Sequence, residues 1–154
     1  MIPLWLIPLF PLVGTIVLAI IALSSSDSKQ GPAESITGAV AVLFPILSFL
    51  SVVTLSVGMP VEGIRGTIGT WIDTAAIQVN IGFLFDGLSR VMLLFITGIG
   101  SLIAIYSVGY MHKDRSFARF FAYINLFLFS MTILVLGDSL LLTFLGWEGV
   151  GLCS

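Results

Sequence analysis

The chain has few charged residues, one cysteine and none of the short motifs that hold a nucleotide. Charged side chains make up 9% of its 154 residues, whereas a soluble domain carries about 25%. The single cysteine, Cys153, excludes an internal disulfide, a cysteine-cluster zinc site and an iron–sulfur cluster held by this chain. The sequence has no glycine-rich dinucleotide fingerprint and no P-loop, and its net charge of −2 argues against a nucleic-acid partner. We therefore expect no cofactor on this chain.

Long uncharged runs make up most of the sequence. The chain is 58% hydrophobic with a mean hydropathy of +1.16, and its charges are bunched between the runs. This pattern predicts an all-α membrane protein, a polytopic transmembrane helix bundle in a single domain over residues 1–154. Four full spans are expected near residues 3–23, 36–59, 87–111 and 118–137. A fifth, 139–154, extends about 24 Å and is short of a full span, so the chain is most simply an N-terminal fragment of a longer protein.

The second loop, residues 60–85, is too polar to cross a membrane. Apolar and polar residues alternate from Ile77 to Phe83, which is the period of a β-strand. Residues 67–72 are a candidate partner strand, with a turn over residues 73–75. We therefore predict a small β-hairpin on the membrane surface, with Trp71 at the interface, where amphipathic indole rings tend to lie.

Glu148 is the most informative single residue, because an uncharged apolar run leads directly into it. If Ser139 begins the fifth helix at the membrane surface, Glu148 lies roughly 13–14 Å deep, near the midplane. A carboxylate at that depth is costly unless it is protonated, paired or hydrated. The position predicts a proton-transfer residue, and the alternative is a neutral, hydrogen-bonded acid that serves only packing. The neighbouring glycines allow either close helix packing or access of water to the carboxylate; they are Gly146, Gly149 and Gly151.

Other polar residues fit structural roles more simply than catalytic ones. Asp86 is placed to cap the third helix, and Arg90 is placed to pair with it at i+4. Asp138 is expected to cap the fifth helix. His112 lies in a charged loop, where a solvated side chain is a simpler interpretation than a proton relay. The polar residues of the fourth helix, Asn125, Ser130 and Thr132, are expected to form interhelical hydrogen bonds rather than a transport path.

Lysine and arginine are unevenly divided between the two sets of loops, and loops that face the cytoplasm carry the excess in membrane proteins. The loops 24–35 and 111–117 are therefore expected on the cytoplasmic or matrix side. The N-terminus, the hairpin and Asp138 are expected on the other side. The loops expected on the cytoplasmic or matrix side, with the adjoining start of the fourth helix, contain Lys29, Lys113, Arg115 and Arg119. The loops expected on the other side, with the adjoining helix, contain Arg65 and Arg90.

Three segments resemble a known family. They are FLFDGLSRVML and RFFAYINLFLFSM, and LGDSLLLTFLG running into WEGVGLCS. They are similar to the N-terminal part of subunit L (chain 5) of proton-pumping NADH:quinone oxidoreductase, respiratory complex I, in the antiporter-like family. The resemblance is specific over residues 83–154 and looser over residues 1–82.

The resemblance implies an antiporter-like fold that moves protons, driven by quinone reduction elsewhere in the complex. It implies that Glu148 matches a glutamate paired with a lysine on a later helix, beyond Ser154. A nearby lysine lowers the pKa of an acid and its withdrawal raises it, so such a pair can load and unload a proton. NADH, flavin, iron–sulfur clusters and quinone are then expected on other subunits. The expected partners are protons, the lipid bilayer and neighbouring membrane subunits, especially antiporter-like ones.

Two other functions compete with a proton-translocating subunit of this oxidoreductase. One is a subunit of a cation/proton antiporter without a redox role, and the other is a structural membrane subunit whose acid is inert. The depth of Glu148 argues against the second. The residues GVGLCS that follow Trp147 and Glu148 favour the oxidoreductase, by resemblance. The expected location is the bacterial cell membrane, or alternatively the mitochondrial inner membrane.

Overall fold

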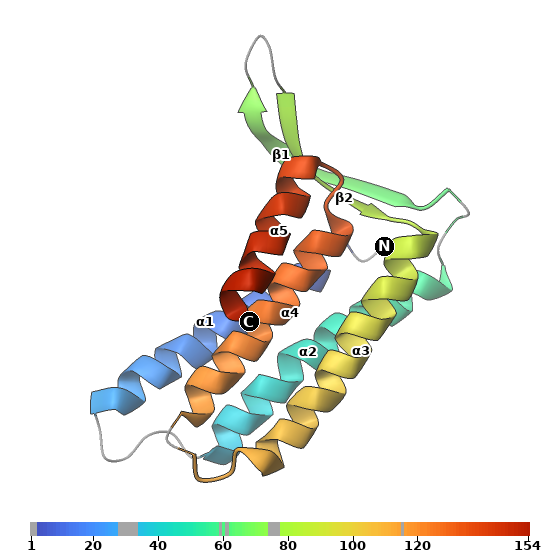
Figure 1. Ribbon diagram of the computed structural model, residues 1–154. Coiled ribbons are helices and arrows are strands. Elements are labelled where there is room, and N and C mark those ends of the chain that lie inside the picture. The colour runs from blue at the N-terminus through green and yellow to red at the C-terminus, as the bar shows by residue number, and fades with distance from the viewer. Residues whose placement is uncertain (1–2, 28–33, 59, 61, 74–77, 115) are drawn as a thin grey trace.

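The computed structural model describes residues 3–27, 34–58, 60, 62–73, 78–114 and 116–154. The helices coincide with the long uncharged runs of the sequence, and four of them are long and apolar enough to cross a membrane. The predicted polytopic bundle with a shorter fifth helix and a two-stranded hairpin is confirmed (Figure 1). The elements are α1 (Leu6–Asp27), α2 (Glu34–Val57), β1 (Ile64–Asp73), β2 (Gln78–Phe85), α3 (Gly87–Tyr110), α4 (Phe117–Leu136) and α5 (Leu140–Cys153).

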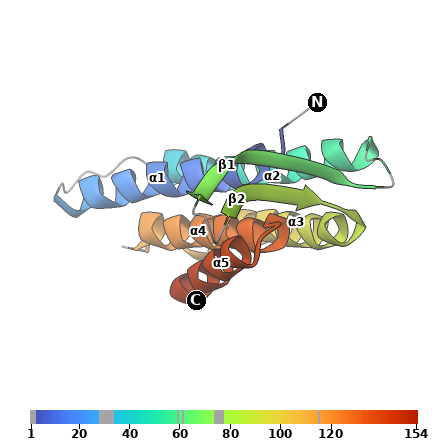
Figure 2. The ribbon, with the colours of Figure 1, turned by 90° about the horizontal axis from the view of Figure 1, so that it is seen from above.

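The long helices lie side by side and form two layers. Helix α1 packs on α2 and α4, and α3 also packs on α2 and α4, so the four helices close into a ring. Figure 2, a view from above, shows α1 and α2 in one layer, α3 and α4 in the next, and α5 outside them against α4. Helix α5 packs mainly on α4, and this contact sets the orientation of the predicted functional residue.

The hairpin is antiparallel, and one end of it is inserted into the bundle. Strand β1 begins at Ile64, earlier than predicted, and Ile64 pairs with Phe85. Phe83 and Phe85 of β2 are buried among apolar side chains of the helices. Ile77 and the turn residues 74 and 75 lie outside the described residues. The buried phenylalanines fix the hairpin to the end of the bundle where α3 begins.

The two predicted sets of loops lie at opposite ends of the bundle (Figure 1). The start of α1, the hairpin and the start of α5 lie at one end, and the end of α1, the start of α2, the end of α3 and the start of α4 lie at the other. Lys29 and Arg115 fall outside the described residues. The arrangement matches the alternation on which the predicted sidedness rests, while the side of the membrane that each end faces stays a prediction.

Helix α1 contains Pro11, which is buried. A proline has no N–H, so the carbonyl four residues earlier loses its helical donor. That carbonyl belongs to Ile7, and the hydroxyl of Ser48 in α2 donates to it at 2.8 Å. The unpaired carbonyl of one helix is therefore satisfied by its neighbour, which is the condition for keeping a proline inside a membrane helix.

Helix α2 repeats the same arrangement at Pro45, which is also buried. The carbonyl that loses its donor belongs to Ala41, and Nδ2 of Asn125 in α4 donates to it at 3.3 Å. Nδ2 also donates to the carbonyl of Phe121 at 3.0 Å. The interhelical hydrogen bond predicted for Asn125 is thus confirmed, and it joins α4 to α2 at the proline. The same prediction is wrong for the other two donors: the hydroxyls of Ser130 and Thr132 donate to carbonyls of α4 itself, at 2.9 Å and 2.7 Å.

Candidate functional site

Helix α5 begins at Ser139, whose hydroxyl oxygen accepts a hydrogen bond from the backbone N–H of Leu142 at 3.3 Å. The prediction that Asp138 caps this helix is therefore wrong. Ser139 has an extended backbone, with φ −120° and ψ 147°, which is the conformation of an N-cap residue. Asp138 precedes the cap, so its carboxylate is not the group that satisfies the first free N–H groups of α5.

Asp138 instead joins the helices to the hairpin. Its backbone N–H donates to the carbonyl of Gly82 in β2 at 3.1 Å, and Gly137 forms an antiparallel bridge with Phe83. The carboxylate of Asp138 lies directly over the Cα of Gly82, where a Cβ would collide with it. Glycine at position 82 is therefore required for this close approach, and the start of α5 is held against the buried strand.

Two of the three glycines near Glu148 form the contact between α5 and α4. A Cβ at Gly146 would lie 2.5 Å from the backbone nitrogen of Leu134, and a Cβ at Gly149 would lie 2.5 Å from the hydroxyl oxygen of Ser130. These positions support the predicted close packing of helices. Gly151 has no atom within 4 Å of such a Cβ among the described residues, so the same packing argument does not extend to it.

Glu148 lies on the side of α5 away from α4. Residues two apart on a helix are about 200° apart around its axis, so Glu148 is nearly opposite Gly146, and its side chain is exposed. Its carboxylate makes no hydrogen bond or ion pair with any described residue. Glu148 belongs to a stripe along this face of α5 whose members are three or four residues apart. The other members are apolar and exposed: Leu141, Leu145 and Leu152.

The other predicted residues lie at the ends of the bundle and are not brought to Glu148. Asp86 caps α3 as predicted, accepting from the N–H of Ser89 at 2.8 Å and from its hydroxyl at 2.6 Å. These hydrogen bonds, first that of the hydroxyl, lower the pKa of Asp86 below its ordinary value. Arg90 forms no ion pair with Asp86 within the described part of the chain, and His112 is exposed in the α3–α4 loop.

Sequence reasoning missed two roles. It placed Asn125 at a helix contact without identifying Ala41 as its acceptor, although the position of Pro45 names that carbonyl. It also missed the contact of Asp138 with Gly82. This contact could not be predicted, because the sequence Gly137-Asp138 is equally compatible with a short extended segment and with a helix cap.

Comparison with known proteins identifies relatives among the membrane subunits of NADH oxidoreductases. A family model described as NADH-Ubiquinone oxidoreductase (complex I), chain 5 N-terminus, matches residues 71–121, a match that ends before Glu148. NADH-quinone oxidoreductase subunit L of Mycobacterium tuberculosis is 50% identical over 93 residues, 60% of this chain and 15% of that relative. The subunit L of Escherichia coli is 51% identical over 85 residues, 55% of this chain and 14% of that relative.

A third relative extends the similarity to almost the whole chain. Subunit L of Pseudomonas aeruginosa is 41% identical over 151 residues, 95% of this chain and 23% of that relative. The chain spans 14–23% of the length of these curated relatives. The resemblance predicted from the motifs is confirmed: this multi-pass membrane chain is similar to the N-terminal part of subunit L, chain 5, of NADH:quinone oxidoreductase.

Proposed function

We propose that the chain is part of a proton-translocating membrane subunit of NADH:quinone oxidoreductase, and that Glu148 is a proton-transfer residue. The observation that carries the second part is the position of Glu148 on α5. Counted from its cap at Ser139, Glu148 lies nine residues along the helix, a rise of about 13–14 Å. That rise brings a titratable side chain close to the middle of a bilayer whose hydrocarbon core is about 30 Å thick.

The orientation of α5 supports the same proposal. The glycine face packs on α4, so the opposite face presents Glu148 within an apolar stripe. Such a stripe is the kind of surface that another membrane helix covers. A basic residue on that helix would hold Glu148 ionised when close and favour its protonation when distant. The carboxylate would then take up and release one proton per movement of its partner.

The rest of the complex follows from the family and is part of the proposal. Electrons would pass through NADH, flavin, iron–sulfur clusters and quinone on other subunits, and this chain would contribute no redox group. Its partners would be the lipid bilayer and neighbouring antiporter-like subunits. The membrane would be the bacterial cell membrane, with the hairpin end on the non-cytoplasmic side, or alternatively the mitochondrial inner membrane. The names of the relatives support this function over an antiporter subunit without a redox role.

The test is Glu148→Gln in the full-length protein within its complex. Glutamine keeps the shape and the hydrogen-bonding capacity but cannot release a proton, so proton translocation should fall at least about tenfold. This is a lower bound, because a positioned acid or base contributes more than that to a proton-transfer step. Glu148→Asp keeps an acid and should retain more activity than Gln. Proton translocation per NADH oxidised is measured in membrane vesicles, with the amount of assembled complex quantified beside it.

A matched control is Glu62→Gln, because Glu62 is an exposed acid outside the membrane helices. It should translocate protons at the parental rate. If Glu148 serves packing alone, the order of the variants reverses: Gln, the closer isostere, is tolerated, and Asp is worse. Parental translocation in Glu148→Gln at normal complex levels would remove Glu148 from the mechanism.

A further inference from the structure

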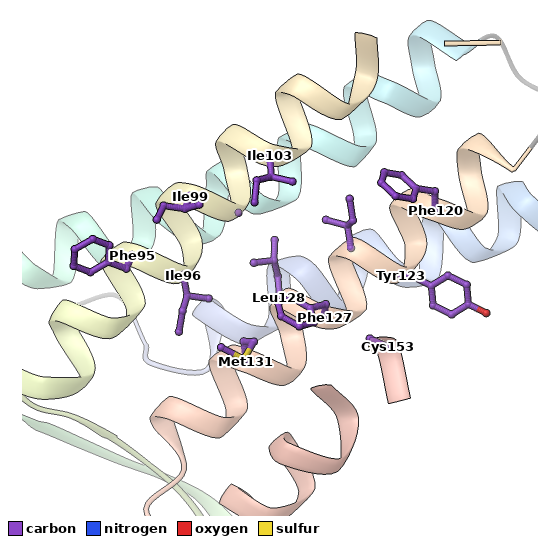
Figure 3. Close-up of a pocket in the computed structure, with 12 residues that line it drawn as sticks. Phe95, Ile96, Ile99, Ile103, Phe120, Tyr123, Phe127, Leu128, Met131 and Cys153 are labelled. Atoms are coloured by element: carbon purple, nitrogen blue, oxygen red, sulfur yellow. The ribbon is translucent and has the colours of Figure 1, made fainter. Parts of the chain in front are cut away.

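An apolar groove runs between α3 and α4 on the face of the bundle away from α1. Its volume is about 600 Å³, within the range of small-molecule sites. Figure 3 shows side chains of both helices turned toward it, with Cys153 of α5 at its edge. The side chains that define it are Phe95, Ile99 and Ile103 of α3 and Phe120, Phe127 and Met131 of α4.

One end of this groove lies at a membrane boundary. All three tyrosines of the chain are exposed and lie within a few turns of the α3–α4 loop, where Tyr106 and Tyr110 stack with ring centroids 6.0 Å apart. Exposed tyrosines concentrate at the headgroup level of a bilayer. Tyr123, the third, lines the groove, so the groove reaches from the headgroup level into the hydrocarbon.

A positively charged residue, Arg119, lies one helical turn before Tyr123. Arg119 is exposed and precedes Tyr123 by four residues, which places the two on the same side of α4, one turn apart. Arg119 forms no hydrogen bond or ion pair with the described residues. The adjoining loop adds Lys113, which is exposed, and its one acid, Asp114, accepts from the backbone N–H of Ser116 at 2.7 Å. This end of the groove is therefore net positive.

We infer that the groove binds an anionic phospholipid, with one acyl chain between α3 and α4 and the phosphate at Arg119 and the Tyr123 hydroxyl. Charge complementarity decides the occupant. A lipid supplies both parts of the match, because its phosphate sits at the headgroup level where the guanidinium lies and its acyl chain fills the apolar part of the groove. Arginine is suited to phosphate because its planar group donates two parallel hydrogen bonds.

The test compares two phospholipids with identical acyl chains, phosphatidylglycerol and phosphatidylcholine. The full-length protein in its native assembly is delipidated, and binding of each fluorescent lipid is titrated. The parent should prefer phosphatidylglycerol. Arg119→Gln should lower the affinity for phosphatidylglycerol about fivefold, since one basic residue at an anionic surface contributes about that factor, and leave phosphatidylcholine unchanged. Arg65→Gln is the matched control and should change neither, because Arg65 belongs to β1 and the hairpin lies at the opposite end of the bundle.

The acyl-chain part is tested with Ile103→Phe, which fills the groove. This variant should weaken binding of both lipids, while Ile16→Phe on α1 should not; the two isoleucines are matched in exposure, at 50% and 51%. A photoreactive amino acid at position 103 then identifies the occupant directly. An adduct with phospholipid supports the inference. An adduct with polypeptide would show that a helix covers the groove, and equal binding of the two lipids that Arg119→Gln does not change would show that the anionic headgroup is not recognised. Either result would overturn the inference.

Discussion

The pairing of Asn125 with Pro45 can be tested by a double-mutant cycle. Nδ2 of Asn125 donates to the carbonyl of Ala41 because residue 45 has no N–H to offer. In Pro45→Ala, the new N–H can donate to Ala41 within the helix, so the amide of Asn125 is no longer needed there. Asn125→Leu should therefore destabilise the parent by more than it destabilises the Pro45→Ala variant.

The size of the coupling follows from the contact. Interhelical hydrogen bonds in a membrane protein average about 0.6 kcal/mol in double-mutant cycles and reach about 1.7 kcal/mol. The distance of 3.3 Å from Nδ2 to the Ala41 oxygen is long for a hydrogen bond. We therefore expect a coupling of about 0.6 kcal/mol. Leucine also removes Oδ1, a buried atom without a partner in the described structure, so the single substitution is a poorer measure than the coupling.

The assay is reversible unfolding of the full-length protein in lipid–detergent mixtures, with the free energy of unfolding determined for all four members of the cycle. The control cycle pairs Asn125→Leu with Pro11→Ala, whose unpaired carbonyl is served by Ser48 instead. That pair should be additive, as expected for substitutions without a shared partner. A coupling of zero in the Pro45 cycle, or an equal coupling in the Pro11 cycle, would refute the assignment of Asn125 to the Ala41 carbonyl.

Three further substitutions test contacts that position the helices. Ser48→Ala should cost about 1 kcal/mol of unfolding free energy and almost nothing in the Pro11→Ala background, measured in the same unfolding assay. Gly82→Ala should cost roughly 1–3 kcal/mol because the new Cβ collides with the Asp138 carboxylate; thermal unfolding should show recovery when Asp138→Ala is added, and no recovery would contradict the contact. Asp86→Ala should cost about 1 kcal/mol as a lost cap. Hydrogen bonds to Ser89 lower the pKa of Asp86 in the folded protein. The difference in unfolding free energy between the parent and Asp86→Ala should therefore be full above about pH 4 and should disappear as the pH falls through the lowered pKa. A difference independent of pH would exclude a role for the charge.

The helices and their order could be predicted from the sequence because each uncharged run long enough to span a bilayer has few alternatives to a helix. The hairpin could be predicted in part. Alternation is clear in β2, whereas in β1 it is interrupted by Gly66 and Gly69, which obscured the start of the strand at Ile64. The bulges in the register near these glycines have no sequence signature that fixes which residues pair.

The candidate site, too, could be predicted only in part. The position of Glu148 nine residues beyond the cap at Ser139 follows from counting residues along a helix, and it needs no knowledge of tertiary structure. The face of α5 that packs on α4 did not follow, because glycines occur on more than one side of the helix and only Gly146 and Gly149 meet a neighbour. The role of Asp138 did not follow either, since it depends on a strand more than fifty residues earlier.

The polar groups at membrane depth separate into two kinds, and this distinction favours a functional role for Glu148. Several donors that face the bundle interior are engaged by the fold: Ser48 and Asn125 donate to carbonyls freed by prolines, and Thr97 donates to a carbonyl of its own helix at 2.6 Å. Oδ1 of Asn125 is the exception, a buried acceptor without a partner among the described residues. Each donor is neutral, so its hydrogen bond offsets the cost of burial. Glu148 differs on both counts, because it is an acid and it is bonded to none of the described residues. Glu148 is directed away from α4 by the glycines that attach α5 to it, so it takes no part in the packing of α5 on α4. This placement supports the proposal that Glu148 exchanges a proton with a partner on that outer face.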